Sequence, residues 1–165
     1  MAWVVLAASA CGYRFVRHEA EPGVDKRVAI QALRNDSFEP GIESLVNEAL
    51  RREFLRRGGL RIVDDASLAD LVIAGAVLPV AWSSRSFSSV NLAIEYEVTL
   101  RLRLEVTRPD GEKLALDPTA LTESELYLAS SDVEVMRKNR EEALRRVANA
   151  LAERVHDVLV ETAAP

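Results

Sequence analysis

The sequence is poor in the residue types that usually build a catalytic or metal centre. It has one cysteine, Cys11, and two histidines in 165 residues. A single cysteine excludes an internal disulfide, and the two histidines lack the spacing of a Cys/His metal cluster. The sequence also lacks a G-x-S-x-G nucleophile elbow, a P-loop and a dinucleotide-binding glycine motif. We therefore predict no catalytic residues and no metal site, and favour a binding or assembly protein over an enzyme.

A basic stripe is missing as well. The formal net charge is -5, and the charges of both signs are interspersed along the chain. Nucleic-acid-binding domains usually carry an excess of Lys and Arg, so we expect no nucleic-acid partner. With 48% hydrophobic and 28% charged residues, the composition is that of an ordinary globular protein, and the length predicts one domain.

The first residues have the pattern of a secretory signal. An uncharged apolar run, 2–10, leads into Cys11 and is too short to span a bilayer. Ala8-Ser9-Ala10-Cys11 resembles the lipobox of bacterial lipoproteins, in which the cysteine is acylated. Cys11 is therefore interpreted either as the site of a lipid anchor, which we favour, or as a buried, inert cysteine. We expect a short or truncated signal over 1–10, a lipidated tether over 11–26, one α/β domain over 27–161 and a tail over 162–165. The only expected non-protein group is the lipid on Cys11.

A long segment of strict alternation dominates the middle of the chain. From Leu92 to Val106 every even position is apolar, and every odd position except Ala93 is polar or charged. Alternation of period two predicts a strand with one buried and one wet face. If 91–107 is all strand, it extends ~55 Å at ~3.3 Å per residue. Such a strand could reach beyond a compact body.

The flanking segments predict an α/β sandwich in which two helices pack on one face of a four-stranded mixed sheet, in the order β-α-β-β-β-α. A first strand at 27–33 and a helix after Pro40 form a right-handed crossover to a parallel strand, and the later strands are antiparallel. Ser131 and Glu134 have the spacing of a capping box for a long last helix. The other expected strands are 60–63 with 71–78, the alternating segment, and 113–129.

An unusual segment separates Pro79 from the alternating strand. It contains five serines together with Trp82, Arg85 and Phe87. A plain loop is one interpretation, and a loop that contacts a partner or ligand is the other, because aromatic residues and arginine are enriched at interfaces. We therefore take these three residues as candidate contacts.

Several short motifs, in their order and spacing over nearly the whole chain, are similar to the LPS-assembly lipoprotein family, LptE. They are Cys11–Phe15, Val28–Ile30, Asn35–Glu43, Ala69–Gly75, Glu95–Val98 and the long final helix. The resemblance implies a lipid-anchored protein on the periplasmic face of the outer membrane. It also implies a role as plug and assembly partner of an LptD-type β-barrel, and binding of lipopolysaccharide.

Arginines on the wet face of the long strand are the candidates for lipopolysaccharide contact. Guanidinium groups bind phosphate bidentately, so Arg101, Arg103 and Arg85 would face lipid A phosphates. Alternatively, Arg101 and Arg103 pair across strands with acidic neighbours. Two other functions are weighed beside the favoured one. They are an outer-membrane lipoprotein that activates a peptidoglycan synthase, and a periplasmic enzyme with an unrecognised carboxylate pair.

Overall fold

A computed structural model describes residues 26–87, 93–117 and 119–163. The expected signal and nearly all of the expected tether, including Cys11, lie outside the described residues. The elements in order are β1 (Lys26–Ile30), β2 (Arg34–Asn35), α1 (Ile42–Arg57), β3 (Leu60–Ile62), the 3-10 helix η1 (Ala66–Leu68), β4 (Leu71–Val77), β5 (Ala81–Phe87), β6 (Ala93–Thr107), β7 (Lys113–Ala115), β8 (Thr122–Leu128) and α2 (Val133–Ala163).

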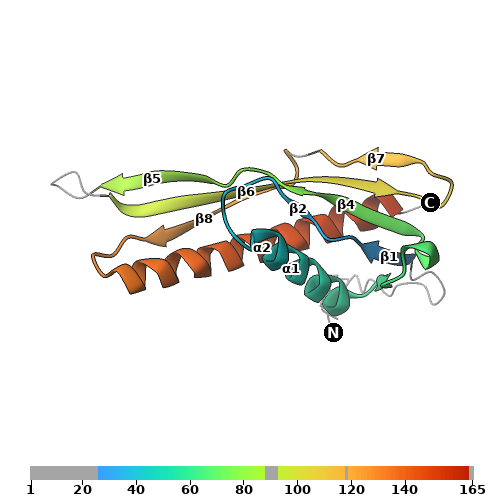
Figure 1. Ribbon diagram of the computed structural model, residues 1–165, viewed down its shortest axis with the longest axis horizontal. Helices are drawn as coiled ribbons and strands as arrows, with labels where there is room; N and C mark the ends of the chain where they lie inside the picture. Colours follow the sequence, from blue (N-terminus) through green and yellow to red (C-terminus); the bar gives the residue numbers. More distant parts are fainter. Residues whose placement is uncertain (1–25, 88–92, 118, 164–165) are drawn as a thin grey trace, which may run out of the picture.

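Strand β6 is the centre of the sheet, as its alternation predicts. Strands β4 and β5 pair in succession along one of its edges, and β7 and β8 pair along the other, all antiparallel to it. Strand β1 lies between β3 and β4 and is parallel to both, which confirms the predicted crossover through α1. The result is an elongated, twisted sheet whose long axis is set by β6 and α2 (Figure 1).

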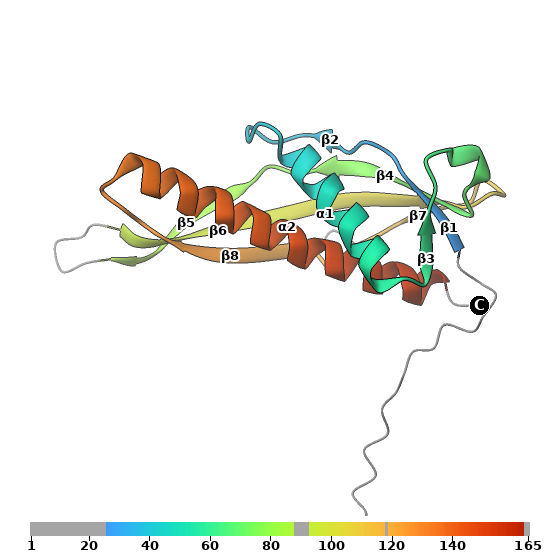
Figure 2. The ribbon, with the colours of Figure 1, turned by 90° about the horizontal axis from the view of Figure 1, so that it is seen from below.

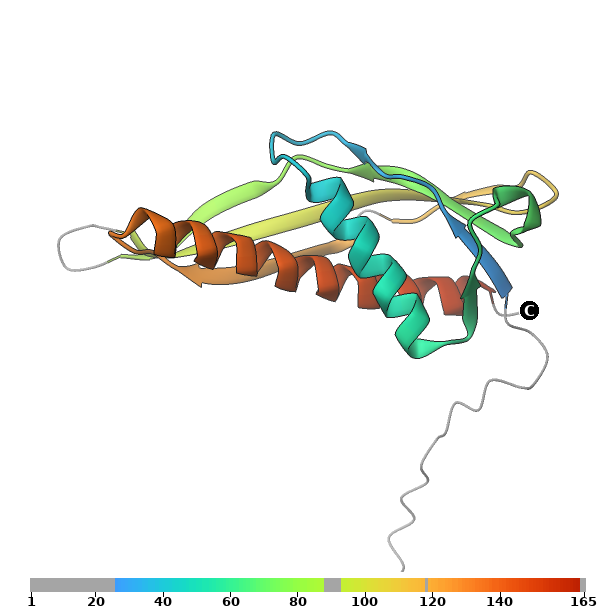
Figure 3. The same ribbon diagram turned by 60° about the horizontal axis from the view of Figure 1, so that its bottom comes forward.

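Both helices cover the same face of the sheet, as predicted (Figures 2 and 3). The even-numbered side chains of β6 from Val98 to Leu104 are 0 to 1% exposed and form the floor of the core. Helix α1 buries Val46, Leu50 and Phe54 against this floor, and α2 adds its own apolar stripe. The stripe of α2 includes Val147, Leu151, Val155 and Leu159. Among the described residues, neither helix is long and apolar enough to cross a membrane.

The sheet has eight strands, so the prediction of four was wrong. Strands β3 and β7 lie in segments that were expected to be extended, but each was counted with its neighbour, β4 or β8, as one strand. The two-residue strand β2 was missed, because so short a segment carries no periodicity. The main error is β5, because we predicted a loop between Pro79 and Val90. Six of the seven residues of β5 are exposed, so burial imposes no alternation on this strand.

The helix expected after Pro40 begins at Ile42, with Gly41 in the left-handed conformation as its N-cap. Gly58 has φ 72° and donates its backbone N–H to the carbonyl of Phe54, which ends α1. At α2 the predicted capping residue, Ser131, was wrong. The carboxylate of Asp132 accepts from the backbone N–H groups of Glu134 and Val135 at 2.8 and 3.1 Å. A carboxylate one residue later therefore satisfies two free donors of the first turn.

Candidate functional site

The odd-numbered side chains of β6 lie on the face of the sheet that the helices leave uncovered. We call this surface, with the residues in register on the neighbouring strands, the open face. Arg101 lies opposite Thr122 of β8, and Arg103 lies opposite Ala76 of β4. Both arginines are exposed, and no ion pair of the described residues involves either of them. The alternative that Arg101 and Arg103 pair with acidic residues across the strands is therefore not supported at these two register positions.

A third arginine joins this pair from a distant part of the chain. Arg34 of β2 is in register with Ala76, so it and Arg103 flank the same buried alanine on the open face. Arg34 donates two hydrogen bonds, of 2.8 and 3.0 Å, to the carboxylate of Asp36. The hydrogen bonds from Arg34 lower the pKa of Asp36, and the charge of Arg103 lowers it further. Two guanidinium groups thus act on the Asp36 carboxylate, and Arg101 lies two residues from Arg103 on the same face, which leaves a local positive excess on an acidic protein.

The other sequence candidates do not join this cluster. Arg85 lies with its Nε 3.6 Å from a carboxylate oxygen of Glu97, so part of its charge is already matched. Phe87 is 58% exposed at the far end of β5, in register with Ala93. Arg101 follows Ala93 by eight positions along β6, which is ~26 Å at ~3.3 Å per residue. The arginine cluster and Phe87 are therefore separate regions of one long strand.

Trp82 lies on the opposite face from the arginines. Its register partner on β6 is Val98, a core residue, so its side chain projects to the helix side of the sheet. There its ring meets Tyr127 edge-on at 6.0 Å, and Tyr127 stacks on Tyr96 at 5.5 Å. The sequence predicts Trp82 as a candidate contact together with Arg85 and Phe87, in a segment that leads into the polar row of β6. Strand β5 is paired so that Trp82 belongs to the dry row instead.

A shallow pocket of about 470 Å³ opens beside this aromatic cluster. We call it the tip pocket, and it is lined by Trp82, Tyr127, Val133, Met136, Arg137 and Arg140. The guanidinium of Arg140 lies 4.3 Å from the centre of the Trp82 ring and forms an ion pair with Glu39 of the β2–α1 connection. Burial raises the pKa of the Tyr127 hydroxyl, and the positive charge of Arg140 partly opposes this.

The sequence analysis missed Arg140, Tyr127 and Glu39 at this pocket. A signal for Arg140 was present, since it follows Met136 by four residues on the otherwise apolar stripe of α2. A charged residue in such a stripe needs a partner on the facing element. Its partner, Glu39, is 101 residues away in sequence, and no local pattern connects the two.

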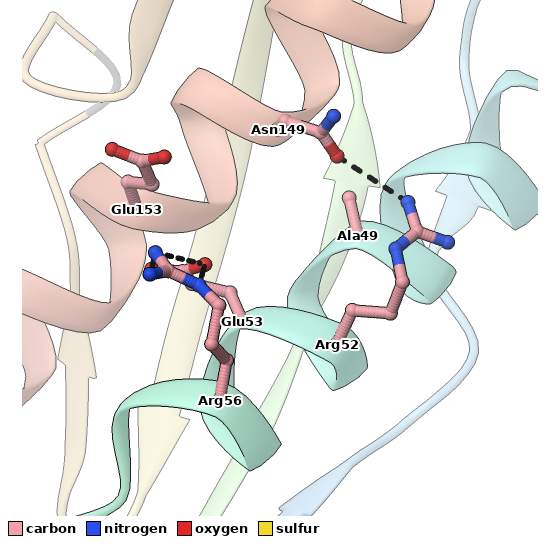
Figure 4. A pocket seen from close by; sticks show the side chains of 6 residues that line it. All are labelled: Ala49, Arg52, Glu53, Arg56, Asn149 and Glu153. Atoms are coloured by element: carbon pink, nitrogen blue, oxygen red, sulfur yellow. Dashed lines mark hydrogen bonds and ion pairs between the residues drawn. The ribbon is translucent and has the colours of Figure 1, made fainter.

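A second pocket, of about 450 Å³, lies between the two helices (Figure 4). Its charged groups already pair with one another: the Glu53 carboxylate accepts from Arg56 at 2.7 Å, and Arg52 reaches Asn149 of α2 at 3.3 Å (Figure 4). Glu53 also pairs with Arg57, which contacts Glu153 and Asp157 on α2. This set of contacts joins α1 to α2 and leaves no unmatched charge to recognise a ligand.

Within the described ranges, no group of three or more His, Cys, Asp or Glu residues is arranged to hold a metal ion. The chemistry available on the open face and in the tip pocket is therefore that of binding. The open face offers guanidinium groups for anions, and the tip pocket offers aromatic and aliphatic surface.

Comparison with known protein families places the chain in one of them. The model of the family described as "LptE: Lipopolysaccharide-assembly" matches residues 26–159. A search of curated proteins found no match. The fold is similar to that of the rare lipoprotein B from Shewanella oneidensis, with a TM-score of 0.57 at 18% identity over 84% of this chain and 96% of that one. It is also similar to a minor lipoprotein from Acinetobacter baumannii, with a TM-score of 0.51 at 14% identity over 86% and 97% of the two chains.

Proposed function

Because the chain belongs to the LptE family of lipopolysaccharide-assembly proteins, we propose that it acts at the outer membrane as the plug and assembly partner of an LptD-type β-barrel. In this role it binds lipopolysaccharide that is destined for the outer leaflet. It performs no catalysis, and it is held at the periplasmic face of the membrane by a lipid on Cys11.

The asymmetry of the sheet supports the plug role. One face is covered by two helices, and the other presents the polar and charged side chains of β6 from Glu95 to Thr107. The lumen of an outer-membrane barrel is polar, so the polar and charged side chains of this face can lie against it. Exposed apolar residues, Phe87, Leu126 and Leu128, lie only toward one end of the face. The elongated shape gives the protein a long side with which to contact a barrel wall (Figure 1).

The arginine cluster of the open face is the observation that carries the ligand proposal. Arg101 and Arg103 are exposed and lack ion-pair partners among the described residues, and Arg34, paired with Asp36, lies across Ala76 from Arg103. Guanidinium groups that are not already neutralised are available for bidentate hydrogen bonds to phosphate. We assign the phosphates of lipid A to this cluster. Arg85, whose charge Glu97 partly matches, has a secondary part.

Charge reversal tests the ligand proposal. Arg101→Glu with Arg103→Glu should weaken binding of purified lipopolysaccharide by at least about tenfold, because two attractive contacts become repulsive. The matched control is Lys138→Glu with Arg145→Glu, which makes the same change of net charge on exposed positions of α2, across the sheet. Equal lipopolysaccharide affinity of the two folded double variants would remove Arg101 and Arg103 from the site.

The lipid anchor is tested separately. Cys11→Ser removes the only thiol that can be acylated, so the variant should leave the membrane fraction and appear in the soluble periplasmic fraction. Unchanged membrane association in a strain that lacks the barrel partner would rule out lipidation of Cys11 as the anchor.

A further inference from the structure

The two long edges of the sheet around β6 differ in how far the rest of the protein covers their outward backbone groups. Strand β8 forms one edge, and side chains of α2 reach over to its outward backbone carbonyls. Arg146 donates to the carbonyl of Leu126 at 3.0 Å, and Asn139 donates to that of Leu128 at 2.9 Å. Natural proteins protect edge strands in this way, because unpaired backbone groups pair readily with another chain.

The opposite edge is covered only along β4. Gln31 donates its N–H to the carbonyl of Ile73, and Asp36 donates to that of Val77, so β1 and β2 occupy the outer edge of β4. The chain then turns away into α1, and the next strand on this edge, β5, pairs only with β6. Figures 2 and 3 show that β5 extends beyond the point where the connection from β2 enters α1.

The register identifies which groups of β5 point outward. The carbonyl of Arg101 accepts from Leu78, whereas those of Ile94 and Leu104 accept from the β7–β8 side. Odd residues of β6 therefore direct their backbone groups toward β5, where Ala81 and Ser83 are their partners. The backbone groups of Trp82 and Ser84 consequently point away from β6. Within the described part of the chain, no hydrogen bond reaches them.

We propose that β5 is a site of strand addition, at which an extended segment of a partner protein pairs with the outward backbone groups of Trp82 and Ser84. Only another backbone offers donors and acceptors at the spacing that a strand edge requires. The inference rests on the proposed function in one respect, since it takes the partner to be the β-barrel protein. The added strand would follow on from β2 along the same edge of the sheet.

The tip pocket defines the chemistry of that segment. A residue directly opposite Trp82 projects to the same side of the sheet as the indole ring. It therefore enters the tip pocket, where Tyr127, Val133 and Met136 present apolar surface. Its neighbours along the segment project to the open face beside Ser83 and Arg85. We expect an extended segment with one large apolar side chain between polar ones.

A bare segment fits this edge better than a second copy of the protein does. The β2–α1 connection is tied over the helix side of β5 by the ion pair of Glu39 with Arg140, which itself lies over Trp82. A second copy would bring its own helices and its own β2–α1 connection to the same side. An extended segment of a larger protein brings only its side chains, for which the tip pocket has room.

Proline substitution on the two edges tests the proposal in the complex purified from membranes. Ser84→Pro removes an N–H that the fold does not use, so thermal melting should be little changed while recovery of the β-barrel partner falls about fivefold or more. Ser84→Thr keeps the N–H and should bind normally. Ser124→Pro removes an outward N–H of β8, the protected edge, together with the hydroxyl that bonds to Thr99 at 2.7 Å, and as a folded variant it should also bind normally.

Hydrogen exchange provides a readout that does not depend on a variant. In the free protein the amides of Trp82 and Ser84 should exchange rapidly, and in the complex they should slow by about tenfold or more. Rapid exchange in the complex, or full recovery of the barrel with folded Ser84→Pro, would overturn strand addition and leave the proposed function intact. If no β-barrel protein co-purifies with the wild type, or if the only effect of Ser84→Pro is loss of self-association, then both the proposed partner and the proposed strand addition at β5 are wrong.

Discussion

Gly75 offers a sharp test of how closely β4 and β6 are packed. A Cβ atom added at Gly75 would lie 2.1 Å from the carbonyl oxygen of Arg103 and 2.9 Å from a methyl group of Leu104. Carbon–oxygen contacts between strands are normally about 3.3 Å, so the two strands would have to separate by about 1 Å. The obstacle is a backbone atom and cannot rotate aside. Gly75→Ala should therefore reduce the free energy of unfolding by about 2 to 3 kcal/mol, the upper part of the range for overpacking.

Urea denaturation followed by circular dichroism measures this loss. The matched control is Gly111→Ala, because Gly111 has φ +84° but no atom within 4 Å of an added Cβ. Its cost should be only the left-handed backbone penalty of about 1 kcal/mol. An unchanged urea m-value would show that the comparison concerns stability alone. If Gly75→Ala costs no more than Gly111→Ala, the close approach of β4 to β6 is wrong.

Two further predictions concern single local contacts. Asp132→Ala should lower the free energy of unfolding by about 1 kcal/mol through loss of the α2 cap, whereas Ser131→Ala should be nearly neutral; equal losses in urea denaturation would contradict the cap assignment. Hydrogen bonds from Arg27 lower the pKa of Asp70 to about 2. Because the pKa of Asp70 is lower in the folded state, the ionised carboxylate stabilises the fold at pH values above the ordinary pKa of Asp. This contribution is lost as the pH falls toward about 2. The stability difference between wild type and Asp70→Asn should therefore shrink between about pH 4 and pH 2. A difference that stays constant over that window would refute the contact.

The sequence was most informative where burial imposes a period. The alternation of β6 identified its strand, its dry face and its central place, and the apolar stripes of both helices predicted which side of each would be buried. The sequence was least informative for β5. This strand is exposed on both faces, and its register against β6 is shifted by one residue relative to β4. The face on which Trp82 lies therefore cannot be counted from residue to residue along the chain.

The candidate site was predictable only in part, because its residues come together through tertiary contacts. Arg101 and Arg103 were identified from their positions in the wet row of β6. The proximity of Arg34 depends on a two-residue strand in parallel register with β4, for which the sequence has no periodic signal. Similarly, the tip pocket depends on Arg140 and Glu39, which the fold joins across nearly the whole length of the domain.

Cross-linking in the native membrane, followed by identification of the protein that is captured, tests the central claim most directly. A photoreactive residue at an exposed position of the open face, such as Arg103, would report on the neighbour of that face. The plug role predicts capture of a large outer-membrane β-barrel protein. Capture of a penicillin-binding protein and no barrel would contradict the assignment and would favour a role in activating a peptidoglycan synthase.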